Sequence, residues 1–236
     1  MQLERLESAF LKYIIDQDAK PGARLPTLAE MSANTGMSIG KLREQLEVAR
    51  NMGVVSVRPR AGIQREPFNF LPAVRNSVLF GLATEEASFA QYSAVRRAIE
   101  TRFWAEAVCL LLPEDKAELQ AIIDRAWTKL RHEPVHIPGR EHRQLHLTIF
   151  RRLNNPFVKG LLEAYWDAYD ASELTRLAAY EYWLTVWEYH ERIVTALCNN
   201  DYDHGLEILI EHFDLLPSVR VPPDMAARQA GSPPAP

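Results

Sequence analysis

Four of the seven histidines in this 236-residue chain have the spacing and surroundings of metal ligands. His142 and His146 are four residues apart, which places both imidazoles on one face of a helix. His190 and His212 lie in two later segments with helical periodicity. On antiparallel helices of one bundle, four neutral imidazoles can converge on a divalent transition metal, with Zn²⁺ or Ni²⁺ the most suitable ions. The alternative is a set of surface or hydrogen-bonded core histidines, because the first pair lacks the glutamate of a zinc-protease helix.

A second chemical signature is a basic segment near the N-terminus. The net charge of the chain is −4, but residues 1–68 carry a balance of +2 and residues 69–236 a balance of −6. Between residues 38 and 65, six basic side chains oppose two acidic ones, which gives +4. A local basic face of this kind attracts phosphate backbones even when the whole protein is acidic. The segment therefore indicates double-stranded DNA as a partner.

Three short helices and a hairpin are expected around this basic segment. Apolar residues recur at helical spacing in residues 3–14, before a turn that contains Pro and Gly. Thr27 and Ser38 can cap a second and a third helix, each closed by a glycine. β-branched residues then flank a turn around Gly62, which predicts a two-stranded wing. This order is that of a winged helix-turn-helix, whose third helix enters the major groove.

Residues 72–216 have the pattern of successive amphipathic helices joined by brief turns. The expected helices cover residues 72–82, 86–110, 114–131, 139–153, 155–169, 173–198 and 203–215. No convincing strand pattern interrupts them, so an all-α bundle of about seven helices is expected. The chain is thus predicted to be mainly α, with a winged helix-turn-helix domain at 1–68 and a helical domain at 69–216. The tail at 217–236 is rich in Pro, Ala and Gly and is expected to be flexible.

Composition excludes several classes of protein. With 47% hydrophobic residues the chain can build a core, so disorder of the whole chain is excluded. No apolar run approaches the ~20 residues of a membrane span, and the first residues do not resemble a secretory signal. We therefore expect a cytoplasmic protein without a membrane segment. Cys109 and Cys198 show no CxxC spacing and are expected to be buried small hydrophobic residues.

The stretch PGARLPTLAEMSANTGMSIGKLREQLEVARNMGVVSVRPRAG resembles the DNA-binding domain of the GntR superfamily. A PG-x-x-LP start, a G-x-S turn, an L-R-E-x-L recognition helix and a glycine-containing wing follow in order. The resemblance implies that six residues meet DNA: Ser38, Lys41 and Arg43 from the recognition helix, and Arg58, Arg60 and Gly62 from the wing. This chain has Leu28, Ala29 and Ile39 where the family commonly has an acidic residue and two arginines. Each missing arginine removes a phosphate or guanine contact.

Three later stretches, VRRAIETRFWAEAVCLL, HRQLHLTIFRRLNNPFVKGLLE and EYHERIVTALCNNDYDHGLEILIEHF, together resemble the FCD effector domain of the FadR branch of that superfamily. Its metal-binding members place an aspartate four residues before a helix histidine. By position, the resemblance implies His146, His190 and His212 as ligands, with His142 at the aspartate position. A neutral imidazole there leaves the metal charge uncompensated, which increases the attraction for an anionic effector.

Arg96 matches the arginine of the family's R-x-x-[LI]-E segment. If it points into the bundle, its guanidinium can bind a carboxylate effector through two parallel hydrogen bonds. The alternative is an ordinary ion pair with Glu100, one helical turn later, which contributes little at a surface. Arg97 is the neighbouring candidate if the helix phase differs by one residue.

These resemblances predict a ligand-responsive transcriptional regulator, most often a repressor in such families. It would bind operator DNA as a homodimer and sense a small carboxylate metabolite. A competing hypothesis is a helical metalloenzyme whose histidine-bound metal activates water. That enzyme would lack a well-placed base, because Glu141 and Glu191 lie about 100° around their helices from the adjacent histidines. A structural bundle that uses its N-terminal module for protein contacts is a third possibility. We expect a regulator and not an enzyme.

Overall fold

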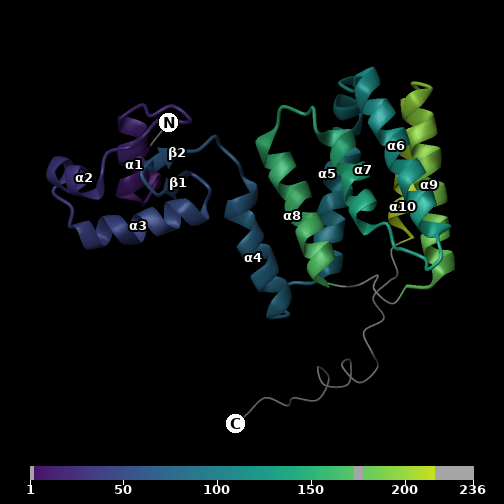
Figure 1. Cartoon of the computed structure of the whole chain (residues 1–236), viewed down its shortest axis with the longest axis horizontal. Coiled ribbons are helices and arrows are strands. Elements are labelled where there is room, and N and C mark those ends of the chain that lie inside the picture. Colours follow the sequence, from purple (N-terminus) through teal and green to yellow (C-terminus); the bar gives the residue numbers. More distant parts are fainter. Residues whose placement is uncertain (1–2, 173–177, 216–236) are drawn as a thin grey trace, which may run out of the picture. The chain divides into compact units, whose positions relative to one another are not determined.

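The computed structural model describes residues 3–172 and 178–215, and Figure 1 shows the chain. In these ranges it contains ten α-helices, one short 3-10 helix (Leu3–Arg5) and a two-stranded sheet, which confirms the mainly α fold. The chain divides into two compact units. The first comprises Met1–Glu86 and Asn154–Ala168, and the second Ala87–Leu153 and the chain from Tyr169. The domain limits expected from the sequence stay a prediction, as does the tail at 217–236, which lies outside the described residues.

The first unit contains the expected helix-turn-helix and wing. Its elements are α1 (Ala9–Asp16), α2 (Leu28–Thr35), α3 (Ile39–Asn51), β1 (Val55–Arg58) and β2 (Gly62–Arg65). The Thr27 side chain accepts a hydrogen bond from the Glu30 backbone, and the Glu30 carboxylate accepts one from the Thr27 backbone, which completes a capping box. Gly36 ends α2 in the left-handed conformation at φ 72°. The Ser38 side chain caps α3 by accepting a hydrogen bond from the Lys41 backbone.

The wing is a short antiparallel hairpin. Val55 lies opposite Arg65, and Arg58 lies opposite Gly62, so residues 59–61 form the tip. The hydrophobic core beneath it is shared by the helices and both strands, and includes Phe10, Ile14, Met31, Leu42, Leu46, Ala49, Val55 and Ile63. Because α3 turns its apolar side to this core, its polar side remains exposed.

Two further elements of this unit are α4 (Leu71–Ala83) and most of α8 (Pro156–Ser172), whose last four residues belong to the second unit. They meet at Gly160, where a Cβ atom would lie 2.7 Å from the backbone nitrogen of Leu71. Any larger residue would force the two backbones apart, so the contact requires glycine. The rings of Phe70 and Phe157 pack edge to face beside it, with centroids 5.1 Å apart.

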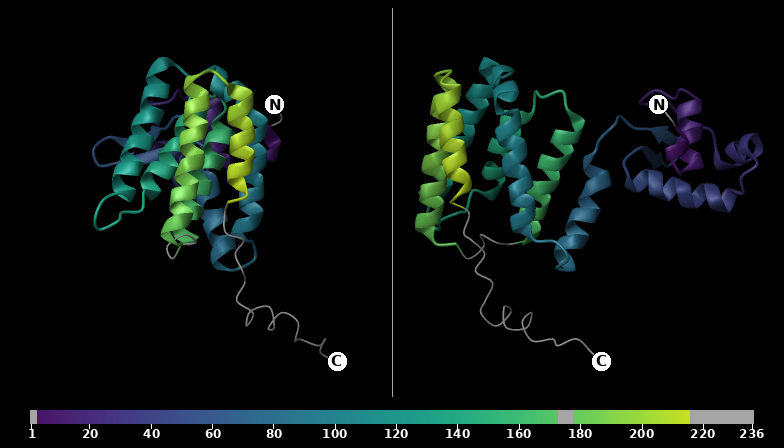
Figure 2. Two further views of the ribbon diagram at one scale, coloured as in Figure 1. Left: turned by 90° about the vertical axis from the view of Figure 1, so that its right-hand side faces the viewer. Right: turned by 180° about the vertical axis from the view of Figure 1, so that it is seen from behind.

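The second unit is a closed ring of helices. It contains α5 (Phe89–Cys109), α6 (Pro113–Leu130), α7 (Gly139–Phe150), α9 (Tyr180–Cys198) and α10 (Tyr202–Phe213). Helix α5 packs on α7, α7 on α6, α6 on α9, α9 on α10, and α10 on α5 again. Figure 2 shows α9 and α10 side by side. The five helices therefore enclose one interior.

The helices α4–α10 confirm the expected series of seven. The helix expected at 173–198 begins at Tyr180, and residues 173–177 lie outside the described residues. The expectation for the cysteines was wrong, because Cys109 and Cys198 end their helices with exposed side chains. In the described ranges, none of the helices combines the length and the apolar composition needed to span a bilayer.

Candidate metal centre

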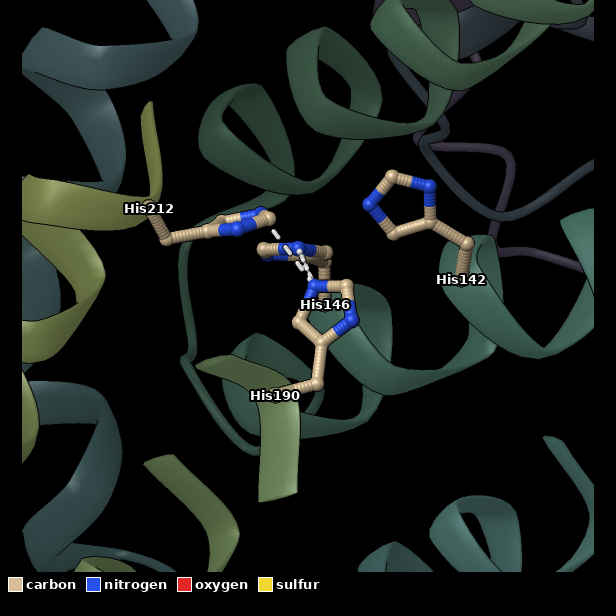
Figure 3. Close-up of side chains that lie close together, drawn as sticks. All are labelled: His142, His146, His190 and His212. Atoms are coloured by element: carbon tan, nitrogen blue, oxygen red, sulfur yellow. Dashed lines mark hydrogen bonds between the residues drawn. The ribbon is translucent and has the colours of Figure 1, made fainter. Parts of the chain in front are cut away.

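Three helices bring the four histidines together inside the ring. Helix α7 carries His142 and His146 on one face, α9 carries His190, and α10 carries His212. All four side chains are buried, and their ligand nitrogens lie within 4.8 Å of one another. The His190 Nε2 atom lies 3.2 Å from His146 Nε2 and 3.2 Å from His212 Nε2. Figure 3 shows these three rings facing one another, with His142 beside them.

The spacing of these nitrogens fits a bound transition metal. Two bonds of about 2.0–2.1 Å at a tetrahedral angle separate their donor atoms by about 3.4 Å, close to the two distances just given. All four side chains offer nitrogen and none offers oxygen. An all-imidazole donor set suits Zn²⁺, Ni²⁺ and their neighbours better than Mg²⁺ or Ca²⁺. The residues present therefore fit the metal that the sequence suggested.

Burial keeps these imidazoles neutral. It is the main cause that lowers the pKa of each of the four histidines well below its ordinary value. The positive charge of Arg96 lowers all four further. Neutral imidazole is the form that binds metal, so protons compete weakly for this site near pH 7.

Helix α5 adds a buried ion pair to the centre. The side chains of Arg96 and Glu100 are 2% and 0% exposed, and Arg96 Nε donates to Glu100 Oε1 at 2.7 Å. Arg96 Nη2 lies 2.9 Å from Nδ1 of His146. Arg96 thus points into the bundle and also pairs with Glu100, while its role in binding an effector stays a prediction. Arg97 instead is partly exposed and binds Asp214 at 2.6 Å, which settles the helix phase.

Comparison with protein families identifies this helical unit. The model of the FCD domain matches residues 91–215, more than half of the chain. The chain belongs to the FCD domain family. Joined to the winged helix-turn-helix, the FCD domain confirms the resemblance to the FadR branch of GntR regulators. These are DNA-binding regulators and not enzymes, as expected.

One solved structure supports the fold. The chain is similar to Streptococcus agalactiae GntR, with 14% sequence identity and a TM-score of 0.64 over 90% of this chain and 95% of that one. It also matches Escherichia coli McbR/YncC, with 20% identity and a TM-score of 0.48 over 94% of this chain and 98% of that one. None of the curated proteins matches the sequence.

A narrow cleft in the FCD domain runs from the histidines toward the end of α10. It is lined by Arg96, His142, Tyr182, His212, Phe213 and Leu215. The side chains fill this cleft, so binding of a ligand there requires them to move apart. Sequence reasoning missed Tyr182, Phe213 and Leu215. Of these three, only Phe213 could have been suspected from the sequence, because it directly follows the candidate ligand His212. In the structure its ring centroid lies 5.2 Å from the guanidinium carbon of Arg96.

The six residues expected to meet DNA all belong to the first unit. Ser38 caps the start of α3, and its hydroxyl accepts a hydrogen bond from the backbone of Lys41. Lys41 and Arg43 are exposed on α3, and Arg58 and Arg60 are exposed in the wing. Gly62 has φ 74°, and a Cβ atom there would lie 3.3 Å from Nε of Arg24. The side chain of Arg24 therefore lies beside Gly62 of the wing and adds a further basic group there. Sequence reasoning missed this residue.

Proposed function

We propose that this chain is a homodimeric repressor that releases operator DNA when a small carboxylate binds beside a metal in its FCD domain. The observation that carries the proposal is the buried convergence of His142, His146, His190 and His212 next to Arg96. Because its target is chromosomal DNA, we place it in the cytoplasm.

The metal site and Arg96 together favour an anionic ligand. The four histidines would hold the ion, which when bound supplies positive charge and Lewis acidity. They bring no negative charge of their own, and Glu100 balances only Arg96. A guanidinium presents pairs of parallel N–H donors, the arrangement that binds a carboxylate through two hydrogen bonds. A carboxylate effector would thus supply the negative charge that the centre lacks.

The winged helix-turn-helix is the part of the chain that would bind operator DNA. Helix α3 and the wing present exposed basic residues, and a dimer would place two such modules on half-sites about one helical turn apart. The effector needs to change the DNA affinity by only about 1–3 kcal/mol to alter operator occupancy severalfold or more.

A DNA-release assay tests the whole proposal. Duplexes selected from a random pool for binding to the metal-loaded protein would be labelled and titrated with mono-, di- and tricarboxylates. We expect at least one carboxylate to release DNA severalfold, while the metal-stripped protein binds the same DNA without responding. Release that is equally strong without metal would contradict the metal-dependent mechanism, and tighter DNA binding in the presence of the carboxylate would overturn release as the response.

Replacing Arg43 by alanine should weaken binding to the selected DNA by about 1–3 kcal/mol if the side chain contacts a base, or reduce the salt dependence if it contacts a phosphate. Arg43 is exposed near the start of α3, so the change should leave the fold intact. Fluorescence anisotropy at several salt concentrations measures both effects. Arg125→Ala, which removes an exposed arginine from α6, is the matched control. Equal affinities of the two variants would remove Arg43 from the recognition surface.

A further inference from the structure

His146 has two neighbours at Nδ1 that demand opposite protonation states. Glu100 Oε2 lies 3.1 Å from this nitrogen, and Arg96 Nη2 lies 2.9 Å from it. A carboxylate only accepts hydrogen bonds and a guanidinium only donates them. A neutral imidazole has one N–H and one lone pair, so Nδ1 can serve one of these neighbours and not both.

The choice decides whether His146 can bind metal. If Nδ1 carries the proton and donates to Glu100, the lone pair is on Nε2, which faces the other histidines. If Nδ1 accepts from Arg96, the proton is on Nε2 and blocks that position. The partner of one nitrogen thus sets the function of the other.

The geometry favours Glu100. Arg96 Nη2 is almost equidistant from the two ring nitrogens of His146, at 2.9 and 3.0 Å, so it is not directed along the lone pair of either. Arg96 Nε already donates to Glu100 Oε1 at 2.7 Å, whereas Nη2 is 3.4 Å from Oε2. The second carboxylate oxygen is therefore the one placed to accept from His146.

We propose that Glu100 is a positioning residue of the metal centre, which holds His146 in the tautomer whose Nε2 is ready for metal. The inference rests on the metal site of the proposed function. Nδ1 of His190 and Nδ1 of His212 have no hydrogen-bond partner among the described residues. Among these three rings, only His146 therefore has a carboxylate beside Nδ1 that can fix its tautomer.

The tautomer of His146 tests this directly in metal-free protein. Long-range ¹⁵N–¹H NMR at pH 8 distinguishes the two tautomers, and His146→Gln identifies the signal. We expect Nδ1–H in the wild type. In Glu100→Gln the amide oxygen should turn to the Arg96 donor, which leaves the NH₂ group facing His146 and moves the proton to Nε2. Nε2–H in the wild type would overturn the proposal, and so would an unchanged tautomer in a folded Glu100→Gln variant.

Metal affinity gives the second readout. Loss of an outer hydrogen-bond partner typically weakens metal binding by about 10- to 100-fold, and we expect Glu100→Gln to weaken Zn²⁺ binding by that factor in a chelator competition. Asp115→Asn is the matched control, because Asp115 is also fully buried and bound by two arginines, Arg151 and Arg152, away from the histidines. Equal Zn²⁺ affinities of wild type and Glu100→Gln would contradict the proposal. A wild type that binds no Zn²⁺ would refute the metal site itself, while the tautomer would still decide the role of Glu100.

Discussion

Replacing both His146 and His190 by alanine should yield a protein without tightly bound metal, whereas the wild type should carry about one transition-metal ion per chain. The two side chains supply half of the candidate ligands, and their Nε2 atoms lie 3.2 Å apart. Four-ligand sites bind with about 10–16 kcal/mol, so loss of half of that would weaken binding by more than about a thousandfold. Elemental analysis of protein purified without a polyhistidine tag measures the metal content.

A second histidine pair in the same domain provides the control. His132 and His136 are also four residues apart, but both are exposed. The double alanine variant of that pair should keep the metal, because it removes two exposed imidazoles that do not belong to the buried centre. It is a matched control, because it removes the same number of imidazoles. Full metal content after loss of His146 and His190 would rule out the buried centre. No metal in any of the proteins would leave the DNA-binding role standing and would move effector sensing to a metal-free pocket.

The fold was largely predictable because its signals are local. Thr27 and Ser38 begin their helices through side-chain caps formed within four residues, and Gly36 ends a helix because it adopts positive φ. Such interactions depend on residues that are neighbours in the sequence, so spacing and residue type reveal them. The exposed cysteines show the limit: residue type predicts burial, but the side of the helix on which Cys109 lies decides it.

The candidate site was predictable only in part. The spacing of His142 and His146 places both on one face of a helix, but it says nothing of their distance from His190 and His212. That convergence depends on how α7, α9 and α10 pack, and only the family resemblance favoured it over ordinary surface or core histidines. The partnership of Glu100 with His146 joins residues 46 positions apart and left no mark in the sequence. Tyr182 enters the cleft for the same reason, through the packing of helices that are distant in the chain.

The metal-free protein should lose stability steeply as the pH falls below about 6.5, the ordinary pKa of histidine. Burial lowers the pKa of all four cluster histidines in the folded state, so the unfolded chain binds protons there that the folded chain does not. Each such histidine reduces the free energy of unfolding by about 1.4 kcal/mol per pH unit between its unfolded and folded pKa. Four together give a slope of up to about 5 kcal/mol per pH unit, a large part of a typical total stability. Above pH 6.5 they contribute no slope.

Urea unfolding in the presence of a chelator, at pH 7.5, 6.5 and 5.5, measures this slope. Tryptophan fluorescence is a suitable signal, because Trp104, Trp183 and Trp187 are buried within the FCD domain. His142→Gln removes one of the four proton sites and should reduce the slope by about a quarter, since each histidine contributes one proton to the linkage. His136→Gln, which changes an exposed histidine, should leave it as in the wild type. If both variants kept the wild-type slope, the loss of stability would come from other groups, and His142 would titrate alike in the folded and unfolded chains. A reduced slope for His142→Gln alone would show that the folded protein holds this imidazole neutral, in the form that a metal needs.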